Sequence, residues 1–376
     1  MRPQTCRAGA KSLGRANNSG IGERPAWQSE LEYAVCTYSQ PGIELMKRIL
    51  NSVGEIVVLL LAVGPSLAAG ALQVASDKPD EDFAFQGEYV GDVGGGDESH
   101  KFALQVIAMG HGKFQAVGYH GGLPGDGWDG EGPKRVEKIG ERQGETLAFT
   151  DPVGTATIRG NEAAIKDPDG NLLGTLKKVM RESRTMNQPA PDGAIILFDG
   201  KNVDQWENGK LTDDGLLQPG TTSKQKFGSC TIHIEFRLPY EPEASGQGRG
   251  NSGIYLQGRY EVQMLDSFGL EGKDNECGGL YSIKGCDLNM CFPPLSWQTY
   301  DLEYTAAKYE NDKLIANPRL TAYHNGVKIH DNVELPGDRN STAAPINAGQ
   351  EPGPLYLQDH GNPVRYRNIW VLKTDK

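Results

Sequence analysis

From about residue 83 to its end, the chain alternates short apolar runs with turns. The runs are rich in Val, Ile, Tyr, Phe and Thr, and Gly, Asn, Asp and Pro separate them. Long amphipathic helical patterns are scarce, and such runs are typical of short strands. The two runs beside Asn325-Gly326 predict a hairpin, because this dipeptide suits a type I′ turn. The pattern therefore predicts an all-β protein.

The run from Asn251 to Ser267 differs most between its two faces. Successive side chains of a strand point to opposite faces of the sheet, so residues of one parity share a face. The even positions are apolar and are expected to close a core: Ile254, Leu256, Tyr260, Val262 and Met264. The odd positions are mostly polar: Asn251, Gly253, Tyr255, Gln257, Arg259, Glu261 and Gln263. Gly258 marks a bend or hairpin, across which the parity need not continue.

The polar parity predicts a ligand-binding face. Amide, guanidinium, carboxylate and phenol groups in a row suit a polyhydroxylated ligand such as a sugar. The alternative is the ordinary solvated face of an antiparallel sheet, on which Glu261 and Arg259 form a surface pair that contributes little. We take Glu261 and Arg259 as candidate catalytic residues. The candidate substrate-binding residues of this run are Asn251, Tyr255, Gln257 and Gln263.

A second polar group lies near the C-terminus, between residues 357 and 370. Asp359 and His360 follow a predicted strand, and loops held by a rigid sheet often carry function. We expect His360 to be catalytic and three neighbours to bind substrate: Gln358, Asp359 and Arg365. In the alternative, Asp359 caps the turn and His360 is simply exposed.

The chain divides into several segments. Residues 83–185 predict a small β-rich accessory domain, and residues 192–376 carry about ten strands, enough for a two-sheet jelly-roll sandwich. Residues 72–82 read as a linker, and the Pro-bearing residues 186–191 connect the two blocks.

The first 71 residues are expected to lie outside the fold. Lys47-Arg48, the apolar run Ile56 to Val63 and the small residues Ala69 and Ala71 together predict a secretory signal peptide over residues 46–71. The apolar run is short for a bilayer span, and an uncleaved anchor is the alternative. Residues 1–45 are either an over-extended reading frame or a disordered leader.

The net charge of −11 and the pI of about 5.2 make the surface acidic. Nucleic acids and anionic membranes require a Lys/Arg patch, so neither is expected as a partner, and the oligomeric state stays open. No cofactor is expected: residues 248–253 match a nucleotide fingerprint by letters only, since no strand–turn–helix unit surrounds them. A divalent metal is compatible with the available ligands, but no spacing requires one.

Four cysteines remain after the leader is set aside: Cys230, Cys277, Cys286 and Cys291. An even number in an exported protein allows disulfides, with three possible pairings. A four-cysteine zinc site is disfavoured, because the spacing lacks the paired Cys-x-x-Cys knuckles of zinc modules.

Several stretches of the second block together resemble the 3-keto-disaccharide hydrolase domain family. They are residues 197–201 (Leu-Phe-Asp-Gly-Lys) with Trp206, then residues 250–258, 260–267, 297–301 and 357–370. The resemblance spans essentially all of the second block and none of the first. It implies a concanavalin A-like jelly roll and a bacterial enzyme, periplasmic or secreted, that acts on glucosides oxidised at carbon 3. Cleavage in this family is formal hydrolysis, or elimination followed by hydration.

A ketone at carbon 3 acidifies the hydrogen on carbon 2, so such an enzyme needs a base, a group that stabilises the enolate, and an acid for the leaving oxygen. The candidates for the base are Glu261 and His360, and the other member of the pair would protonate the leaving group. Arg259 or Arg365 would stabilise the enolate. The competing hypotheses are a non-catalytic, lectin-like protein of the cell envelope and an envelope protein that grips a partner chain.

Overall fold

The computed structural model describes residues 79–94, 99–128 and 136–374. These residues form strands joined by turns, with one short 3-10 turn at Gly246–Gly248 and no α-helix among them, and the all-β prediction is confirmed. They belong to one compact unit. The predicted leader and signal peptide (residues 1–71) and most of the first linker lie outside the described residues. Within the described part of the chain, no helix is both long and apolar enough to cross a bilayer.

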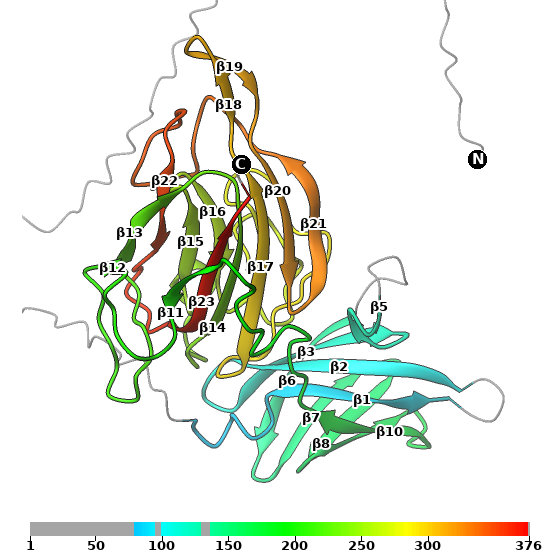
Figure 1. Ribbon diagram of the computed structural model, residues 1–376. Coiled ribbons are helices and arrows are strands. Elements are labelled where there is room, and N and C mark those ends of the chain that lie inside the picture. Colours follow the sequence, from blue (N-terminus) through cyan, green and yellow to red (C-terminus); the bar gives the residue numbers. More distant parts are fainter. Residues whose placement is uncertain (1–78, 95–98, 129–135, 375–376) are drawn as a thin grey trace, which may run out of the picture. The chain divides into compact units, whose positions relative to one another are not determined.

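The first block is a closed barrel of antiparallel strands (Figure 1). Its core is formed by buried side chains that include Tyr89, Phe114, Leu147 and Ile158. In order around the barrel, the strands are β1 (Gly87–Val93), β10 (Leu172–Val179), β9 (Glu162–Lys166), β8 (Gly154–Arg159), β7 (Thr146–Asp151), β6 (Val136–Gln143), β3 (Lys113–His120) and β2 (His100–Ala108). A parallel pair, β4 (Leu123–Pro124) and β5 (Gly127–Trp128), follows β3.

The second block contains a six-stranded and a five-stranded sheet. The six-stranded sheet has the order β11 (Ile195–Phe198), β23 (Arg365–Lys373), β14 (Cys230–Arg237), β17 (Trp297–Thr305), β20 (Arg319–His324) and β21 (Val327–Glu334). The five-stranded sheet has the order β12 (Trp206–Glu207), β13 (Thr221–Phe227), β22 (Gly353–Leu357), β15 (Ser252–Leu256) and β16 (Tyr260–Met264). A further pair, β18 (Lys308–Glu310) and β19 (Lys313–Ala316), extends from the sandwich.

Alternation along the strands builds the core between the two sheets. Ile232, Ile234 and Phe236 of β14 are fully buried, and they share one cluster with Ile254 and Val262 of the other sheet. The same cluster continues into the barrel through five residues: Ala103, Ile107, Val117, Tyr119 and Leu123. The two blocks therefore share apolar surface as well as a linker.

The hairpin predicted at Asn325-Gly326 is confirmed. β20 pairs with β21, and Asn325 and Gly326 have φ angles of 53° and 74°, as a type I′ turn requires. Of the four cysteines considered for disulfides, Cys277, Cys286 and Cys291 are free thiols in the structure. Cys277 and Cys291 are buried, and the Cys277 sulfur lies 3.2 Å from the Tyr300 hydroxyl.

The segment between the blocks is hydrogen-bonded to the six-stranded sheet. Ser183 Oγ lies 2.6 Å from Thr299 Oγ1, and Thr185 Oγ1 donates to Asp301 Oδ2 at 2.6 Å. The Asn187 amide donates to Glu235 Oε1, also at 2.6 Å. These partners occupy odd positions of β14 and β17, on the sheet face opposite the core.

Glu235 is the centre of this contact and is fully buried. Arg367 Nε donates to its carboxylate at 2.6 Å, and Asn368 Nδ2 does so at 2.8 Å. Burial alone would raise the pKa of Glu235, but the nearby His233, whose Nε2 lies 3.6 Å away, and hydrogen bonds from Asn368 and Arg367 lower it to about 2. The linker is thus attached to a buried, ionised carboxylate.

Replacing Glu235 by Gln is expected to lower the free energy of unfolding at pH 7 by on the order of 3 kcal/mol, because it leaves the Arg367 guanidinium without its charged partner. The lowered pKa means that this stabilisation is present above the ordinary value of 4.5 and is lost as the pH falls through about 2. Urea unfolding at pH 7 and at pH 2 measures the difference. The exposed Glu310→Gln is the control, and equal stability of the two variants at pH 7 would contradict the account.

Candidate functional site

Glu261 lies on β16 and faces the hairpin partner β15. The register pairs Tyr255 with Glu261 and Gly253 with Gln263, so the odd parity continues across the turn and these side chains share one face. Gly253 makes room for the carboxylate, because a Cβ atom there would lie 2.2 Å from Glu261 Oε1. The missing side chain at position 253 therefore lets Glu261 lie flat across its neighbour strand.

The Glu261 carboxyl group is almost inaccessible to solvent. The residue is 2% exposed, and the Tyr255 hydroxyl donates to Oε2 at 2.7 Å. No Lys, Arg or His of the described residues forms an ion pair with it. Burial raises the pKa of Glu261 to about 7, although the Tyr255 hydrogen bond works in the opposite direction. A carboxyl group with such a pKa can both take and return a proton near neutral pH.

Gln358 extends the line of hydrogen bonds that joins Glu261 and Tyr255. Its Nε2 donates to the Tyr255 hydroxyl at 3.1 Å, and its backbone amide donates to Gly253 O at 2.9 Å. The Tyr356 ring lies 5.5 Å from the Tyr255 ring on the same sheet. Gln358 Oε1 is buried and has no hydrogen-bond partner among the described residues. Gln358, Tyr255 and Glu261 thus form a line of amide, phenol and carboxyl groups.

Gln263 and Asn251 lie beside this line, and both hydrogen-bond to Gln247, which the sequence patterns did not single out. Gln263 Nε2 donates to Gln247 Oε1 at 3.0 Å, and Asn251 Nδ2 donates to the same oxygen at 3.1 Å and to Gln247 O at 2.7 Å. Asn251 Oδ1 is buried without a partner in the described part of the chain. Gln247 lies in a Gly-rich loop without periodicity, so no sequence signal pointed to it.

The segment from Ser341 to Ile346 lies against the hairpin that carries Glu261. Ser341 Oγ accepts from the Glu261 amide at 3.1 Å, and Thr342 O accepts from the Tyr255 hydroxyl at 3.2 Å. The amides of Ser341 and Ile346 donate to carbonyls of the turn. Cavities of about 690, 200 and 150 Å³ elsewhere in the described residues do not include Glu261 in their walls. The carboxyl group is therefore covered.

Gln257 and Arg259, expected on the same face, lie in the turn instead. Gln257 and Gly258 have positive φ angles of 52° and 64°, so the strand alternation is interrupted there. Arg259 Nη1 donates to Gln257 Oε1 at 2.8 Å, and its Nε donates to Asn347 O at the same distance. Gln257 Nε2 donates to Phe227 O at 2.9 Å. Neither of these two described residues forms a hydrogen bond or an ion pair with the Glu261 carboxyl group.

The site residues expected between positions 358 and 365 do not lie together in the structure. Asp359 is exposed, and its Oδ1 accepts from the Gly361 amide at 2.9 Å, as a turn cap does. His360 is exposed on the same loop. Arg365 begins β23 in the other sheet, opposite Arg237, and donates to Val364 O at 3.1 Å. Of this group, the structure brings only Gln358 into hydrogen-bond contact with the line at Glu261.

No group of three or more His, Cys, Asp or Glu side chains in the described residues is arranged to hold a metal ion. The second carboxylate near β16, Asp266, is engaged with Arg249, whose Nε lies 2.6 Å from Asp266 Oδ2. Among the described residues, the face around Glu261 therefore offers the Glu261 carboxyl group, the phenols of Tyr255 and Tyr356, and several amides.

Comparison with known proteins assigns the C-terminal block to a family. Residues 193–372 match the family described as the 3-keto-alpha-glucoside-1,2-lyase-like domain. The C-terminal block belongs to this family. Residues 193–372 form the lyase-like domain. The match supports a carbohydrate-active, glycosidase-type function for them, in agreement with the resemblance noted from the sequence.

Two crystal structures from Parabacteroides distasonis, each described as a "putative glycosyl hydrolase", are similar to the chain. One is 32% identical and covers 49% of this chain and 85% of its own, with a TM-score of 0.45. The other is 19% identical and covers 49% of this chain and 95% of its own, with a TM-score of 0.36. Among curated proteins, none matches the chain.

The raised pKa of Glu261 has a consequence for the stability of the lyase-like domain. The folded state favours the protonated carboxyl group, so its stabilising effect is complete below the ordinary pKa of 4.5 and is lost as the pH rises through about 7. Glu261→Gln removes this loss, and we expect it to gain on the order of 3 kcal/mol relative to the wild type between pH 4.5 and pH 8. Urea unfolding at both pH values measures it; a pH-independent difference would contradict the assignment.

Proposed function

We propose that the lyase-like domain cleaves the glycosidic bond of 3-keto-glucosides, with Glu261 as the group that moves the proton of carbon 2. One observation carries the proposal: a domain of the family described as 3-keto-alpha-glucoside-1,2-lyase-like contains a buried carboxyl group of pKa about 7 that has no cationic partner among the described residues. The family description supplies the substrate class, and the carboxyl group supplies the chemistry.

The proposed reaction begins with proton transfer from carbon 2 to Glu261. The electron pair of the broken C–H bond forms the enolate, whose charge rests on the carbon 3 oxygen. Collapse of the enolate forms the double bond between carbons 1 and 2 and expels the group on carbon 1, whose oxygen takes a proton. Addition of water across the double bond would give the net products of hydrolysis. Because the reaction needs one proton carrier, a single carboxyl group is sufficient.

Tyr255 and Gln358 are proposed to stabilise the enolate oxygen in place of the arginines expected from the sequence. Burial, followed by the nearby Glu261 charge, raises the pKa of Tyr255 above its usual range, so the phenol keeps its proton. The hydroxyl donates this proton to Glu261 Oε2 before the reaction, and it would turn to the enolate oxygen once Glu261 has become a neutral carboxylic acid. Gln358 contributes an amide donor at 3.1 Å from that phenol. Donors fixed before the reaction stabilise developing charge efficiently. Arg259 and Arg365 donate elsewhere.

A direct glycosidase mechanism is less well supported. It requires two carboxyl groups on either side of the scissile bond. Asp266 is held by Arg249, and Asp359 caps an exposed turn. The proton returned to the leaving oxygen is therefore assigned to Glu261 as well, after it has taken the proton of carbon 2.

Sugar access requires that the Ser341–Ile346 segment move from Glu261. Its contacts with the hairpin are a few hydrogen bonds, and Thr342 Oγ1 lies 3.4 Å from Ser282 Oγ of the neighbouring loop. Loops that close over a site and exclude water are common among enzymes. In the proposed cycle, this segment opens for the substrate and closes for the reaction.

Glu261→Gln is expected to lower kcat for a 3-keto-glucoside by about 10²- to 10⁴-fold, because the amide cannot take the proton of carbon 2. Its Kd for the substrate, measured by calorimetry, should change little. The exposed Glu303→Gln is the matched control. Full activity of Glu261→Gln would refute the role of this residue. Sugar binding by the wild type without any turnover would favour the lectin-like alternative.

A reversible crosslink tests the moving segment. In Ser282→Cys/Thr342→Cys, the two replaced hydroxyls lie near enough for a disulfide. We expect the oxidised variant to lose at least about nine-tenths of its turnover and to regain it on addition of a thiol reductant, since the closed segment blocks entry. Each single Cys variant is the control. An oxidised double variant that turns over normally would show that the substrate reaches Glu261 by another route.

A further inference from the structure

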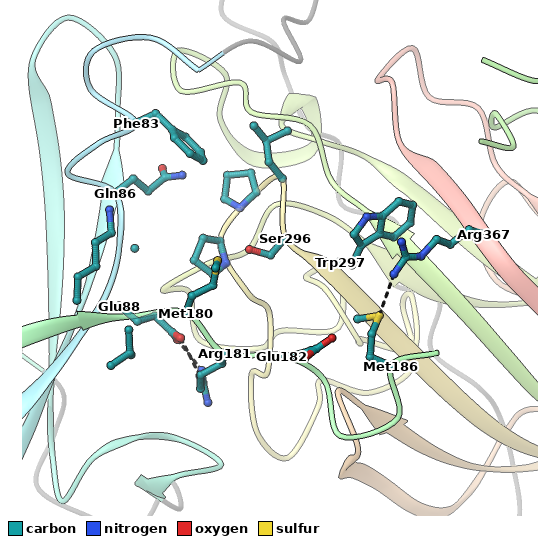
Figure 2. Close-up of a pocket in the computed structure, with 16 residues that line it drawn as sticks. Phe83, Gln86, Glu88, Met180, Arg181, Glu182, Met186, Ser296, Trp297 and Arg367 are labelled. Atoms are coloured by element: carbon teal, nitrogen blue, oxygen red, sulfur yellow. Dashed lines mark hydrogen bonds and ion pairs between the residues drawn. The ribbon is translucent and has the colours of Figure 1, made fainter. Parts of the chain in front are cut away.

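A cavity of about 690 Å³ opens where the barrel, the linker and the sandwich meet (Figure 2). The barrel contributes Gln86, Glu88 and Lys178, and the loop before β17 contributes Pro293 to Trp297. This volume is typical of small-molecule sites. None of the residues in its wall belongs to the hydrogen-bonded line at Glu261, so the cavity is a separate feature of the molecule.

Gln86 is the polar group that marks this cavity as a binding site. The residue is 3% exposed, and its Oε1 accepts from the Ala108 amide at 3.0 Å, which fixes the side chain. Its Nε2 has no hydrogen-bond partner among the described residues. Figure 2 shows the amide end of Gln86 directed into the space that Ser296 faces from the other wall. A buried donor without an acceptor is destabilising, and a ligand oxygen would satisfy it.

The cationic groups of the wall are already engaged. Arg181 Nε donates to Glu88 Oε2 at 2.7 Å, and Arg367 Nε donates to Glu235 at 2.6 Å. Lys178 Nζ donates to Ala84 O at 2.6 Å. Because the two arginines are paired with carboxylates and Lys178 donates to a backbone carbonyl, the cavity does not suit an anion. Glu182, which Figure 2 shows beside the cavity, is an exposed carboxylate with no hydrogen bond or ion pair to the described residues.

The remaining wall is largely apolar. Phe83, Leu295 and Trp297 line it together with Met180 and Met186. The Arg367 guanidinium lies 4.1 Å from the centre of the Trp297 ring, which holds the indole in place. Apolar walls with a few fixed polar groups suit a ligand that has both C–H faces and hydroxyl groups. An oxygen of such a ligand can accept from Gln86, and its hydroxyls can donate to Glu182.

We propose that this cavity is a second, non-catalytic site that binds a neutral saccharide. The site would hold sugar chains at the junction of the barrel and the lyase-like domain. Sugar binding would then be the role of the barrel. The choice of a sugar among neutral polyols rests on the proposed function, whereas the cavity and its unpaired donor do not. Glu261 and this site are expected to bind sugar independently, because they share no residue.

The test is calorimetric titration of the whole chain with unoxidised α-1,4- and β-1,4-linked glucose tetrasaccharides. Gln86→Glu keeps an acceptor for the Ala108 amide but removes the free donor, and Ser296→Phe fills the cavity from the opposite wall. Each is expected to weaken binding of at least one tetrasaccharide by at least about tenfold. Gln143→Glu, at an exposed position of the same barrel, and Glu261→Gln are expected to leave Kd unchanged.

The turnover of a 3-keto-glucoside is measured on the same variants, and Gln86→Glu and Ser296→Phe are expected to retain the wild-type rate. The inference is overturned if the wild type binds neither tetrasaccharide, or if both cavity variants bind as the wild type does. Binding that both cavity variants retain and that oxidised Ser282→Cys/Thr342→Cys loses would place the sugar at the candidate catalytic face instead. The proposed function is judged separately, by turnover alone.

Discussion

Tyr255 and Glu261 face each other across the β15–β16 hairpin, and the site depends on their hydrogen bond of 2.7 Å in a dry interior. The bond is possible because Gly253 has no side chain where the carboxylate lies. With no cation paired to it among the described residues, the carboxyl group keeps its proton up to about pH 7. Gln358 and Gln263 extend the same polar face, and the core on the opposite face holds the hairpin in place.

Each sheet of the sandwich carries one buried carboxyl group, and the pKa values of the two groups are shifted in opposite directions. On the face of the five-stranded sheet that points away from the core, Glu261 has no cationic partner among the described residues and is close to neutral. On the outer side of the six-stranded sheet, Glu235 is surrounded by donors and stays ionised. The first arrangement suits proton transfer, since the pKa lies near the working pH. The second suits attachment of the linker, because removal of one partner from a buried charge is strongly unfavourable.

The fold class could be predicted from the sequence, because alternation and turn residues are local signals. Asn325-Gly326 and the apolar even positions of residues 251–267 are examples, and both have the expected structure. The residues of the candidate site could be predicted from the sequence only in part. Parity alone grouped Tyr255, Glu261 and Gln263, but it also included Gln257 and Arg259, since a strand pattern cannot show that positive φ angles begin at Gln257. Gln247 and Thr342 come from loops without periodicity, and their contacts depend on long-range packing.

The central claim is that Glu261 takes a proton from carbon 2, and isotope exchange tests it most directly. A 3-keto-glucoside is incubated with the protein in heavy water, and the product is followed by proton and mass spectra, with a protein-free sample as the control for spontaneous exchange. The account predicts deuterium at carbon 2 of the product with the wild type, and loss of this enzyme-dependent label with Glu261→Gln. Cleavage by the wild type that leaves the carbon 2 hydrogen in place would contradict it.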